Sequence, residues 1–425
     1  MKLKLKKNNV KKILFGNVFK KNLLLKHVFF YDYDGKLLYS YLNSEFLNLL
    51  YLPSLPDRTS ENLTCDGLNW TLQEIKDQIN NVECDVYVGA IYHTTNDKTH
   101  ITCKPTETYP YASICLTPTV SNAVTVDWGD GNTDTWTNSV EETKTHTYTG
   151  VTDSSVYDIT ISCSNGTYSF NNYITGSLQN NQNCVYTDIK LSNKVTSLGN
   201  YCFRQCYFLQ SINIPSGVTN LGAHCFYNCY SLQFIAIPSG VTSLDYQCFR
   251  QCYFLQFIAI PNSVTSLGIN CFYNCSSLQS ITIPNGVTSL DIYCFGNCNS
   301  LQLLTIPNSV TSLGIQCFSN CNSLKSINIP NGVTSLGDYC FNQCFSLQSI
   351  NIPNGVTSLG SGCFTQCYSL KKIYMKPLTP PTLASTDVIL NNANLVIYVP
   401  RGTLSAYQSA SNWSSYASKM VEYDY

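Results

Sequence analysis

Charged side chains are scarce in this sequence. Asp, Glu, Lys and Arg make up 12% of the 425 residues, whereas 30 tyrosines and 19 phenylalanines make it rich in aromatic rings. Soluble domains average about a quarter charged residues, so much of this surface must be Ser, Thr, Asn, Gln and Tyr. The charge is also uneven, because residues 1–26 hold nine lysines and no acid while the rest of the chain carries a net charge of −10. This excess of acid argues against a nucleic-acid-binding groove in the main body.

Long apolar runs and catalytic motifs are missing as well. No segment approaches the 18 or more consecutive apolar residues of a membrane span. The five histidines, His27, His93, His100, His146 and His224, stand in different local settings. No glycine-rich phosphate loop and no HExxH motif is present. We therefore expect a protein that is not an enzyme and that binds no cofactor and no metal ion.

The lysine-rich start of the chain contains one apolar stretch, ILFGNVF, of seven residues, and no small-residue cleavage site follows it. We therefore interpret residues 1–27 as a basic arm rather than a signal peptide. Such an arm is either a solvated tail or an attachment segment for an acidic partner surface.

Internal repetition dominates the second half of the chain. Residues 191–371 repeat every 23 residues, eight times. In the unit SINIPNGVTSLGDYCFNQCFSLQ, residues 326–348, the alternation of Ile327 and Ile329 predicts a short strand that ends at proline. VTSL predicts a second extended piece, and YCFNQC predicts a helical turn with both cysteines on one inward face. One unit cannot bury its apolar side chains alone, so the repeats must stack into a solenoid.

Sixteen of the 22 cysteines fall into two columns of this solenoid, one running from Cys202 to Cys363 and one from Cys206 to Cys367. We favour burial of both columns, because cysteine packs as a small hydrophobe in a tight interior. Disulfides along a column and a thiolate metal site are the alternatives. C-x3-C without a nearby histidine is a weak zinc pattern.

The repeat unit L-x-x-I-x-I-P-x-x-V-T-S-L-G-x-x-C-F-x-x-C resembles the BspA-like leucine-rich repeats of surface proteins from gut and oral microbes. Those repeats usually carry alanine where this chain has its first cysteine, and both residues are small and buried. Residues 379–420 are similar to the cap that closes such arrays. There we expect a last strand at Leu395–Val399 and a helix over Leu404–Met420 that covers the open end of the core.

Upstream of the repeats, AVTVDWGDGNTDTW at residues 123–136 alternates apolar and polar positions up to a Gly-Asp-Gly hairpin turn. Together with the later segments THTY and YDITI, it is similar to a PKD-like immunoglobulin sandwich, which we place at residues 104–183. We interpret Asp127 and Asp130 as hydrogen-bonding partners within the hairpin, with a calcium site as the alternative.

In residues 28–103 we expect a smaller module with strands, short helices and a hairpin over residues 84–103. From FYDYDG through CDGLNWTLQEIK to VYVGAIYHTTNDK, it resembles the N-terminal part of minor structural proteins of tailed bacteriophages. The expected fold is therefore multidomain and β-rich. Its parts are a basic arm (1–27), a small α+β module (28–103), a PKD-like sandwich (104–183), a leucine-rich-repeat solenoid (184–375) and a strand-helix cap (376–425).

These resemblances imply a non-enzymatic protein that presents its repeats for adhesion. We expect a bacteriophage virion surface protein whose N-terminal region binds virion structural proteins and whose repeats bind a host surface protein or glycan. A secreted or cell-surface bacterial adhesin and a decoration protein without a receptor are the alternatives. By analogy with phage fibres we expect a homo-oligomer, and we expect no nucleic-acid partner.

Positions around the cysteines vary between repeats while the framework stays constant. The residue after the second cysteine is tyrosine in the first three repeats but Ser276 and Asn299 in the next two. Such positions must face solvent, and exposed tyrosine with arginine is typical of recognition surfaces. An aromatic ladder that only stabilises the stack or an oligomer interface is the alternative. The candidate ligand-binding residues are Arg204, Tyr207, Tyr227, Tyr230, Phe234, Arg250, Tyr253, Phe257 and Tyr273.

Overall fold

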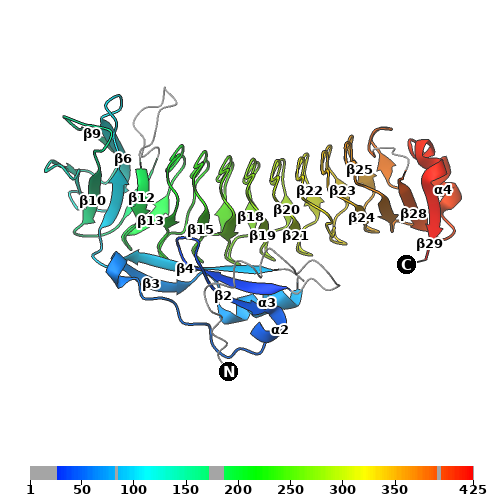
Figure 1. The fold of residues 1–425 in the computed structure, drawn as a ribbon, viewed down its shortest axis with the longest axis horizontal. Coiled ribbons are helices and arrows are strands. Elements are labelled where there is room, and N and C mark those ends of the chain that lie inside the picture. Colours follow the sequence, from blue (N-terminus) through cyan, green and yellow to red (C-terminus); the bar gives the residue numbers. More distant parts are fainter. Residues whose placement is uncertain (1–25, 82–84, 172–185, 390–393, 425) are drawn as a thin grey trace.

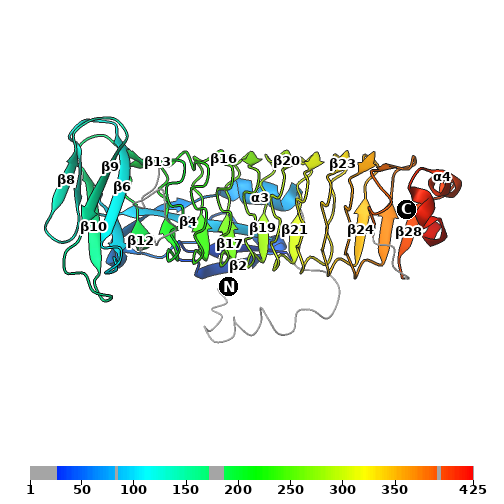
Figure 2. The same cartoon turned by 90° about the horizontal axis from the view of Figure 1, so that it is seen from above.

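The computed structural model describes residues 26–81, 85–171, 186–389 and 394–424 and shows an elongated molecule with a smaller module against its side (Figure 1). Two β-sheets at one end continue into a β-solenoid of about ten turns, from residue 168 to residue 423. Figure 2 shows these sheets and the C-terminal cap at opposite ends of the solenoid. The predicted β-rich class and the solenoid are confirmed. The basic arm, apart from Lys26 and His27, lies outside the described residues.

The module at the side of the solenoid is a four-stranded sheet with helices on one face. Its strand order is β2-β1-β4-β3, and β1 and β4 are parallel. Phe30 of β1 and Ile75 of α3 are both fully buried in the core between sheet and helices. The elements are β1 (His27–Tyr31), β2 (Leu37–Leu42), α2 (Asn43–Phe46), η1 (Thr59–Glu61), β3 (Leu63–Leu68), α3 (Leu72–Asn81) and β4 (Val86–Thr94).

The next strands form two sheets that run without a break into the solenoid. One sheet has the order β14-β12-β5-β10-β7-β8 and the other β13-β11-β6-β9. Both sheets contribute to one buried cluster that continues through all the repeats and includes Trp128 and Trp136. The strands are β5 (Thr99–Cys103), β6 (Tyr111–Pro118), β7 (Val124–Asp127), β8 (Thr133–Trp136), β9 (Glu142–Thr147), β10 (Tyr157–Cys163), β11 (Tyr168–Phe170), β12 (Tyr186–Lys190), β13 (Val195–Leu198) and β14 (Ile212–Asn213).

The hairpin expected over residues 84–103 is wrong. β4 belongs to the sheet of the side module, whereas β5 pairs with β10 and β12 in the six-stranded sheet. The chain therefore crosses from one sheet to the other between Thr94 and Thr99, and the Thr94 N–H donates to the Leu191 carbonyl at the start of the repeats.

Most repeats contribute two short parallel strands to the solenoid, and equivalent residues pair at a spacing of 23, as Phe234 does with Phe257. Leu221 and Asn328 form isolated bridges instead, so the strand predicted around Ile327 and Ile329 is reduced to bridges at Asn328. We call the surface formed by the outward residues of the first set the strand face. The first set is β14, β15 (Phe234–Ala236), β17 (Phe257–Ala259), β19 (Ser280–Thr282), β21 (Leu303–Thr305), β24 (Ser349–Ile352) and β26 (Lys372–Met375). The second set is β13, β16 (Ser243–Leu244), β18 (Ser266–Leu267), β20 (Ser289–Leu290), β22 (Ser312–Leu313), β23 (Ser335–Leu336), β25 (Ser358–Leu359) and β27 (Thr382–Leu383).

The cap at the C-terminal end consists of two strands and two short helices. Its elements are β28 (Val396–Pro400), α4 (Leu404–Ser409), η2 (Trp413–Lys419) and β29 (Met420–Tyr423). The predicted last strand is confirmed, but the single helix over 404–420 is wrong, because Ala410 is extended and Asn412 is left-handed. Trp413 is fully buried and donates its indole N–H to the Pro381 carbonyl at 2.6 Å.

Candidate functional site

The segments around the two cysteines of each repeat are runs of tight turns, and we call the surface they form the turn face. The residue before the second cysteine has φ between +60° and +63° in all eight repeats. The residue before the first cysteine is also left-handed in every repeat. Left-handed residues interrupt a right-handed helix, so the helical turn expected here is wrong. Asn and Gln occupy the position before the second cysteine throughout, and asparagine is among the residues that best tolerate this conformation.

Backbone hydrogen bonds between repeats hold these turns in register. The Phe203 N–H donates to the Cys225 carbonyl at 2.8 Å, and the Gln205 N–H donates to the Tyr227 carbonyl at 2.7 Å. The Cys206 N–H instead donates within its own repeat, to the Phe203 carbonyl. Side chains at equivalent positions of successive repeats are therefore stacked directly on one another along the turn face.

Both cysteine columns lie in the interior behind the turn face. All sixteen repeat cysteines are fully buried, so the predicted burial is confirmed. The second cysteine of repeats two to eight points its thiol at the carbonyl of the phenylalanine 26 residues earlier, as Cys252 does toward Phe226 at 3.2 Å. Burial raises the pKa of Cys321 to about 12. Among the described residues every cysteine is free of disulfide bonds.

The first of two columns on the turn face consists of Tyr207, Tyr230 and Tyr253, and we call it the Tyr column. Ring centroids of Tyr207 and Tyr230 lie 4.8 Å apart, and those of Tyr230 and Tyr253 lie 4.9 Å apart. All three side chains are partly exposed. Ser276 continues the column in the fourth repeat and donates its hydroxyl to the Tyr253 carbonyl. The structure therefore brings these three candidate residues together on one surface.

The second column alternates arginine and tyrosine, and we call Arg204, Tyr227, Arg250 and Tyr273 the Arg–Tyr column. The Arg204 guanidinium carbon lies 5.2 Å from the centre of the Tyr227 ring. That of Arg250 lies 5.7 Å from the Tyr227 ring and 5.0 Å from the Tyr273 ring. These distances are in the range of cation–π contacts. All four side chains are partly exposed, so the column is a second set of candidate residues that lie side by side.

His224 lies beside this column and was not among the predicted site residues. Its ring stacks on Tyr201 with centroids 4.6 Å apart, and its edge meets Tyr246 at 5.1 Å. Burial, together with the positive charges of Arg204 and Arg250, lowers the pKa of His224 to about 4. The sequence could have indicated His224, because it occupies the position before the first cysteine, which varies from repeat to repeat.

Phe234 and Phe257 lie on the strand face, away from these columns, where the side module covers them. Phe234 is 1% exposed, and its ring centroid lies 5.3 Å from that of Tyr31. Phe257 packs against Tyr31 and Tyr87 at 5.3 and 5.6 Å. The expectation that Phe234 faces solvent is therefore wrong. Both phenylalanines belong to an intramolecular interface.

Hydrogen bonds also hold the module against the strand face. Asn69 donates to the Ala259 carbonyl at 3.0 Å, and the Trp70 indole donates to the Ile260 carbonyl at 2.7 Å. Thr282 donates its hydroxyl to the Asp85 carbonyl at 2.7 Å. Two of the repeats that carry this interface read QFIAIP where others read QSINIP, so apolar residues replace polar ones at their outward positions. That substitution was the sequence signal for the interface.

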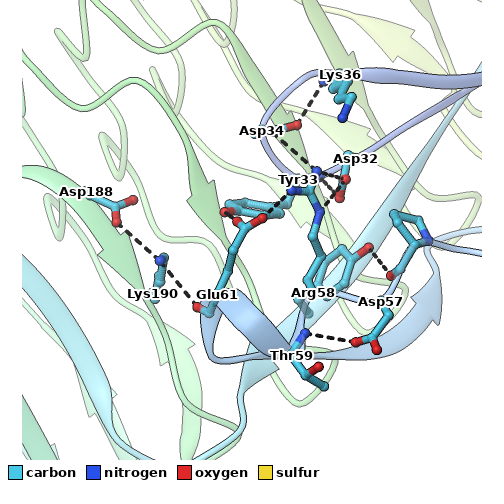
Figure 3. A network of polar contacts seen from close by, with 12 residues as sticks. Asp32, Tyr33, Asp34, Lys36, Asp57, Arg58, Thr59, Glu61, Asp188 and Lys190 are labelled. Atoms are coloured by element: carbon cyan, nitrogen blue, oxygen red, sulfur yellow. Dashed lines mark hydrogen bonds and ion pairs between the residues drawn. The ribbon is translucent and has the colours of Figure 1, made fainter.

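A polar network fixes one loop of the module near the start of the solenoid (Figure 3). Arg58 donates to Asp32, whose side chain is fully buried, and to Glu61. Burial alone would raise the pKa of Glu61, but hydrogen bonds from Arg58 and Tyr33 lower it. Lys190 of β12 donates to the Glu61 carbonyl at 3.4 Å. Opposite charges are paired within this network, so we assign it to holding the module in place.

The carboxylates of the WGDG hairpin are engaged within the protein. Asp130 Oδ2 lies 2.7 Å from His146 Nε2, and the His146 ring stacks on Trp128 at 5.4 Å. Asp127 accepts the Gly129 N–H at 2.9 Å. In the described part of the chain, no group of three or more His, Cys, Asp or Glu side chains could hold a metal ion. The helices of that same part include none that is long and apolar enough to cross a membrane.

Comparison with known proteins places the repeats in a family. Residues 179–302 and 288–379 match the family described as "BspA type Leucine rich repeat region", in six copies, and this part of the chain is therefore a BspA-type repeat region. The resemblance predicted from the repeat unit is thus confirmed for the repeats. No curated protein matches the chain.

Several solved structures are similar to part of the chain. A leucine-rich repeat protein from Bacteroides ovatus is 30% identical over 49% of this chain, with a TM-score of 0.44, and the chain spans 52% of that protein's length. A leucine-rich cell surface protein from Faecalibacterium prausnitzii is 22% identical over 58% of this chain and 94% of its own, with a TM-score of 0.27. The pneumococcal vaccine antigen PcpA is 15% identical over 59% of this chain and 81% of its own, with a TM-score of 0.28.

Proposed function

We propose that this protein is a non-enzymatic adhesin, secreted or displayed on a bacterial cell surface, that binds a glycan or surface protein of its target through the turn face of repeats one to four. The observation that carries this proposal is that the Tyr column and the Arg–Tyr column both lie on the partly exposed turns of the first four repeats. Tyrosine and arginine dominate protein recognition surfaces, and tyrosine rings can also stack on sugars.

The location follows from the repeat type and the surface. BspA-type repeats resemble those of microbial surface proteins, and the family is typically non-enzymatic. The virion location and the phage partners predicted from residues 28–103 remain predictions, because the family match covers the repeats alone. We also keep the PKD-like assignment as a proposal, supported by the two sheets that enclose Trp128 and Trp136.

A triple substitution of the Tyr column tests the proposal, and the chain supplies its own template. Ser276 shows that the scaffold accepts serine in this column. Tyr207→Ser, Tyr230→Ser and Tyr253→Ser combined should leave the melting temperature nearly unchanged and abolish attachment to host cells and to a glycan array.

The matched control removes two aromatic rings from the same column at the far end of the solenoid. Phe345 and Tyr368 stack at 5.6 Å in repeats seven and eight. Phe345→Asn with Tyr368→Asn should retain attachment, since Asn322 occupies this position in repeat six. Full attachment by the triple variant would place the site elsewhere. A large fall in melting temperature, or dissociation of an oligomer measured by light scattering, would show that the column is structural.

A further inference from the structure

Positive charge is concentrated on the turn face in a stretch with almost no other charge. Between residues 195 and 290 the only charged side chains are Arg204, Asp245 and Arg250. The two arginines occupy the same position two repeats apart, so they point along one surface roughly 10 Å from each other. Asp245 lies three residues before a first cysteine, and its carboxylate accepts the Ser243 hydroxyl at 3.4 Å.

The guanidinium of Arg250 has no acceptor within the described part of the protein. The guanidinium carbon lies 5.7 Å from the centre of the Tyr227 ring and 5.0 Å from the centre of the Tyr273 ring. Its N–H groups point outward in the plane of the group, toward the edges rather than the faces. Among the described residues, the Arg250 guanidinium makes no hydrogen bond or ion pair to a protein acceptor, and its Nε is buried without one. Because no protein acceptor engages the guanidinium, its terminal N–H groups are suited to bidentate contact with a carboxylate or sulfate.

Neighbouring groups favour an anion at the same place. His224 packs against Tyr227 at 5.5 Å, and its buried Nδ1 also lacks a hydrogen-bond partner among the described residues. The charges of Arg204 and Arg250 help to lower its pKa, which shows that both guanidinium charges act on this spot. The Arg–Tyr column ends at Tyr273, because the fifth repeat has Gly296 at the equivalent position. A Cβ on Gly296 would lie 3.0 Å from the Tyr273 ring.

The Tyr column distinguishes among anionic ligands. Three tyrosine rings lie 4.8–4.9 Å apart along the solenoid, on the turn face of the same repeats as the arginines, and are partly exposed. Stacked rings beside a guanidinium suit a sugar that carries an acidic group. A long polyanion such as a nucleic acid is disfavoured by the net charge of −10 on residues 27–425.

We propose that the Arg–Tyr column binds the carboxylate or sulfate group of an acidic glycan while the exposed parts of the Tyr column contact its sugar rings. This inference rests on the proposed adhesive function and specifies the class of its ligand.

The experiment compares two charge-matched double variants on a glycan array of neutral, sialylated and sulfated oligosaccharides. Arg204→Asn with Arg250→Asn follows Asn342, which occupies this position in repeat seven. Lys325→Gln with Lys371→Gln removes the same charge elsewhere and follows the glutamine found at that position in the other six repeats. The arginine variant should lose about tenfold or more in affinity for acidic glycans, and the lysine variant should match the wild type. Removing sialic acid from the sialylated oligosaccharides, and sulfate from the sulfated ones, then identifies which acidic group is bound.

Three results would overturn the inference while the adhesive function stands. These are equal binding of neutral and acidic glycans by the wild type, unchanged acidic binding by the arginine variant, and equally effective competition by single-stranded DNA. Failure of the wild type to bind any glycan or host cell would instead overturn the proposed function. If the arginine double variant does not fold, Arg250→Lys keeps the charge and loses the bidentate geometry, and should still weaken acidic binding. Unchanged acidic binding by a folded Arg250→Lys would also overturn the inference.

Discussion

Gly89 of β4 lies against Ala236 of β15, and a Cβ atom built on Gly89 would stand 2.3 Å from the Cβ of Ala236. The module and the solenoid therefore meet at a point where there is no room for a side chain on one partner. Gly89→Ala should destabilise the docked module by about 1–3 kcal/mol, because overpacking forces the two backbones apart. Limited proteolysis of the module and hydrogen exchange in β4 would measure the loss.

The compensating change is Ala236→Gly. In the double variant the Cβ of residue 236 is absent, so the module should regain part of its protection against proteolysis and hydrogen exchange. Recovery should stay incomplete because the new Cβ at residue 89 would still lie 3.1 Å from the Cβ of Ala259. If the Gly89→Ala variant is as resistant to proteolysis and hydrogen exchange as the wild type, the contact between Gly89 and Ala236 has room for a Cβ and the prediction is wrong.

The left-handed turns give a second prediction. Gln251 has φ +63°, a conformation that costs a residue with a branched Cβ more than about 1–2 kcal/mol. Gln251→Val should lower the guanidinium unfolding midpoint accordingly. Gln251→Asn is the control, because Asn228 and Asn274 occupy this position in neighbouring repeats and both variants lose the bond from Gln251 to the Tyr253 hydroxyl. Equal midpoints for the two variants would mean that the turn is not strained by valine.

Cysteine reactivity should follow burial. Cys65 is exposed and Cys163 is partly exposed, whereas the sixteen repeat cysteines are fully buried. Burial raises the pKa of Cys65 and Cys163 as it does that of Cys225 and Cys248, so access to the reagent is what separates the two groups. Brief treatment of the native protein with iodoacetamide at pH 8 should therefore modify Cys65 and Cys163 and spare the repeats, as peptide mass spectrometry would show. Unfolding in guanidinium should make the repeat cysteines react. Alkylation of Cys252 or Cys275 in protein that keeps its fold would contradict the burial.

His224 should make stability depend on pH. The unfolded chain takes up a proton at this residue near pH 6.5, whereas the folded protein does so only near pH 4. Between these values the unfolded state binds more protons, so the folded state loses stability as the pH falls from about 6.5 toward 4. His224→Gln removes this effect, and Gln247 and Gln316 show that glutamine fits the position.

The unfolding free energy of the variant relative to the wild type should therefore rise as the pH falls through this window. Because the ring is partly exposed, the change should be about 1 kcal/mol or less. Urea titrations at pH 7, 5.5 and 4.5 would measure it. A difference between the two proteins that stays constant across these values would show that His224 titrates normally.

The repeat period, the strands and the burial of both cysteine columns could be predicted because they arise from local patterns that recur eight times. The turns were mispredicted because C-x3-C spacing fits a helix, whereas Asn and Gln before each second cysteine adopt left-handed φ instead. Docking of Phe234 and Phe257 onto Tyr31 could not be predicted from local patterns, since these residues lie about two hundred positions apart in the sequence. Aromatic residues at variable positions therefore have two roles. Phe234 and Phe257 pack against the side module, whereas the Tyr column and the Arg–Tyr column are partly exposed on the turn face. Only the three-dimensional structure distinguishes the two groups.

The contacts between the side module and the strand face also set an order of events during synthesis. Asn69 and Trp70 bond to repeat residues 190 positions later, and Gln78 bonds to one 205 positions later. A ribosome adding 5–20 residues per second needs roughly 10–40 s to make the chain between these partners. Throughout that interval the aromatic surface of Phe29, Tyr31 and Tyr87 has no cover. Slowing of translation within the first four repeats should therefore increase capture of the nascent chain by chaperones, more than slowing in the last four.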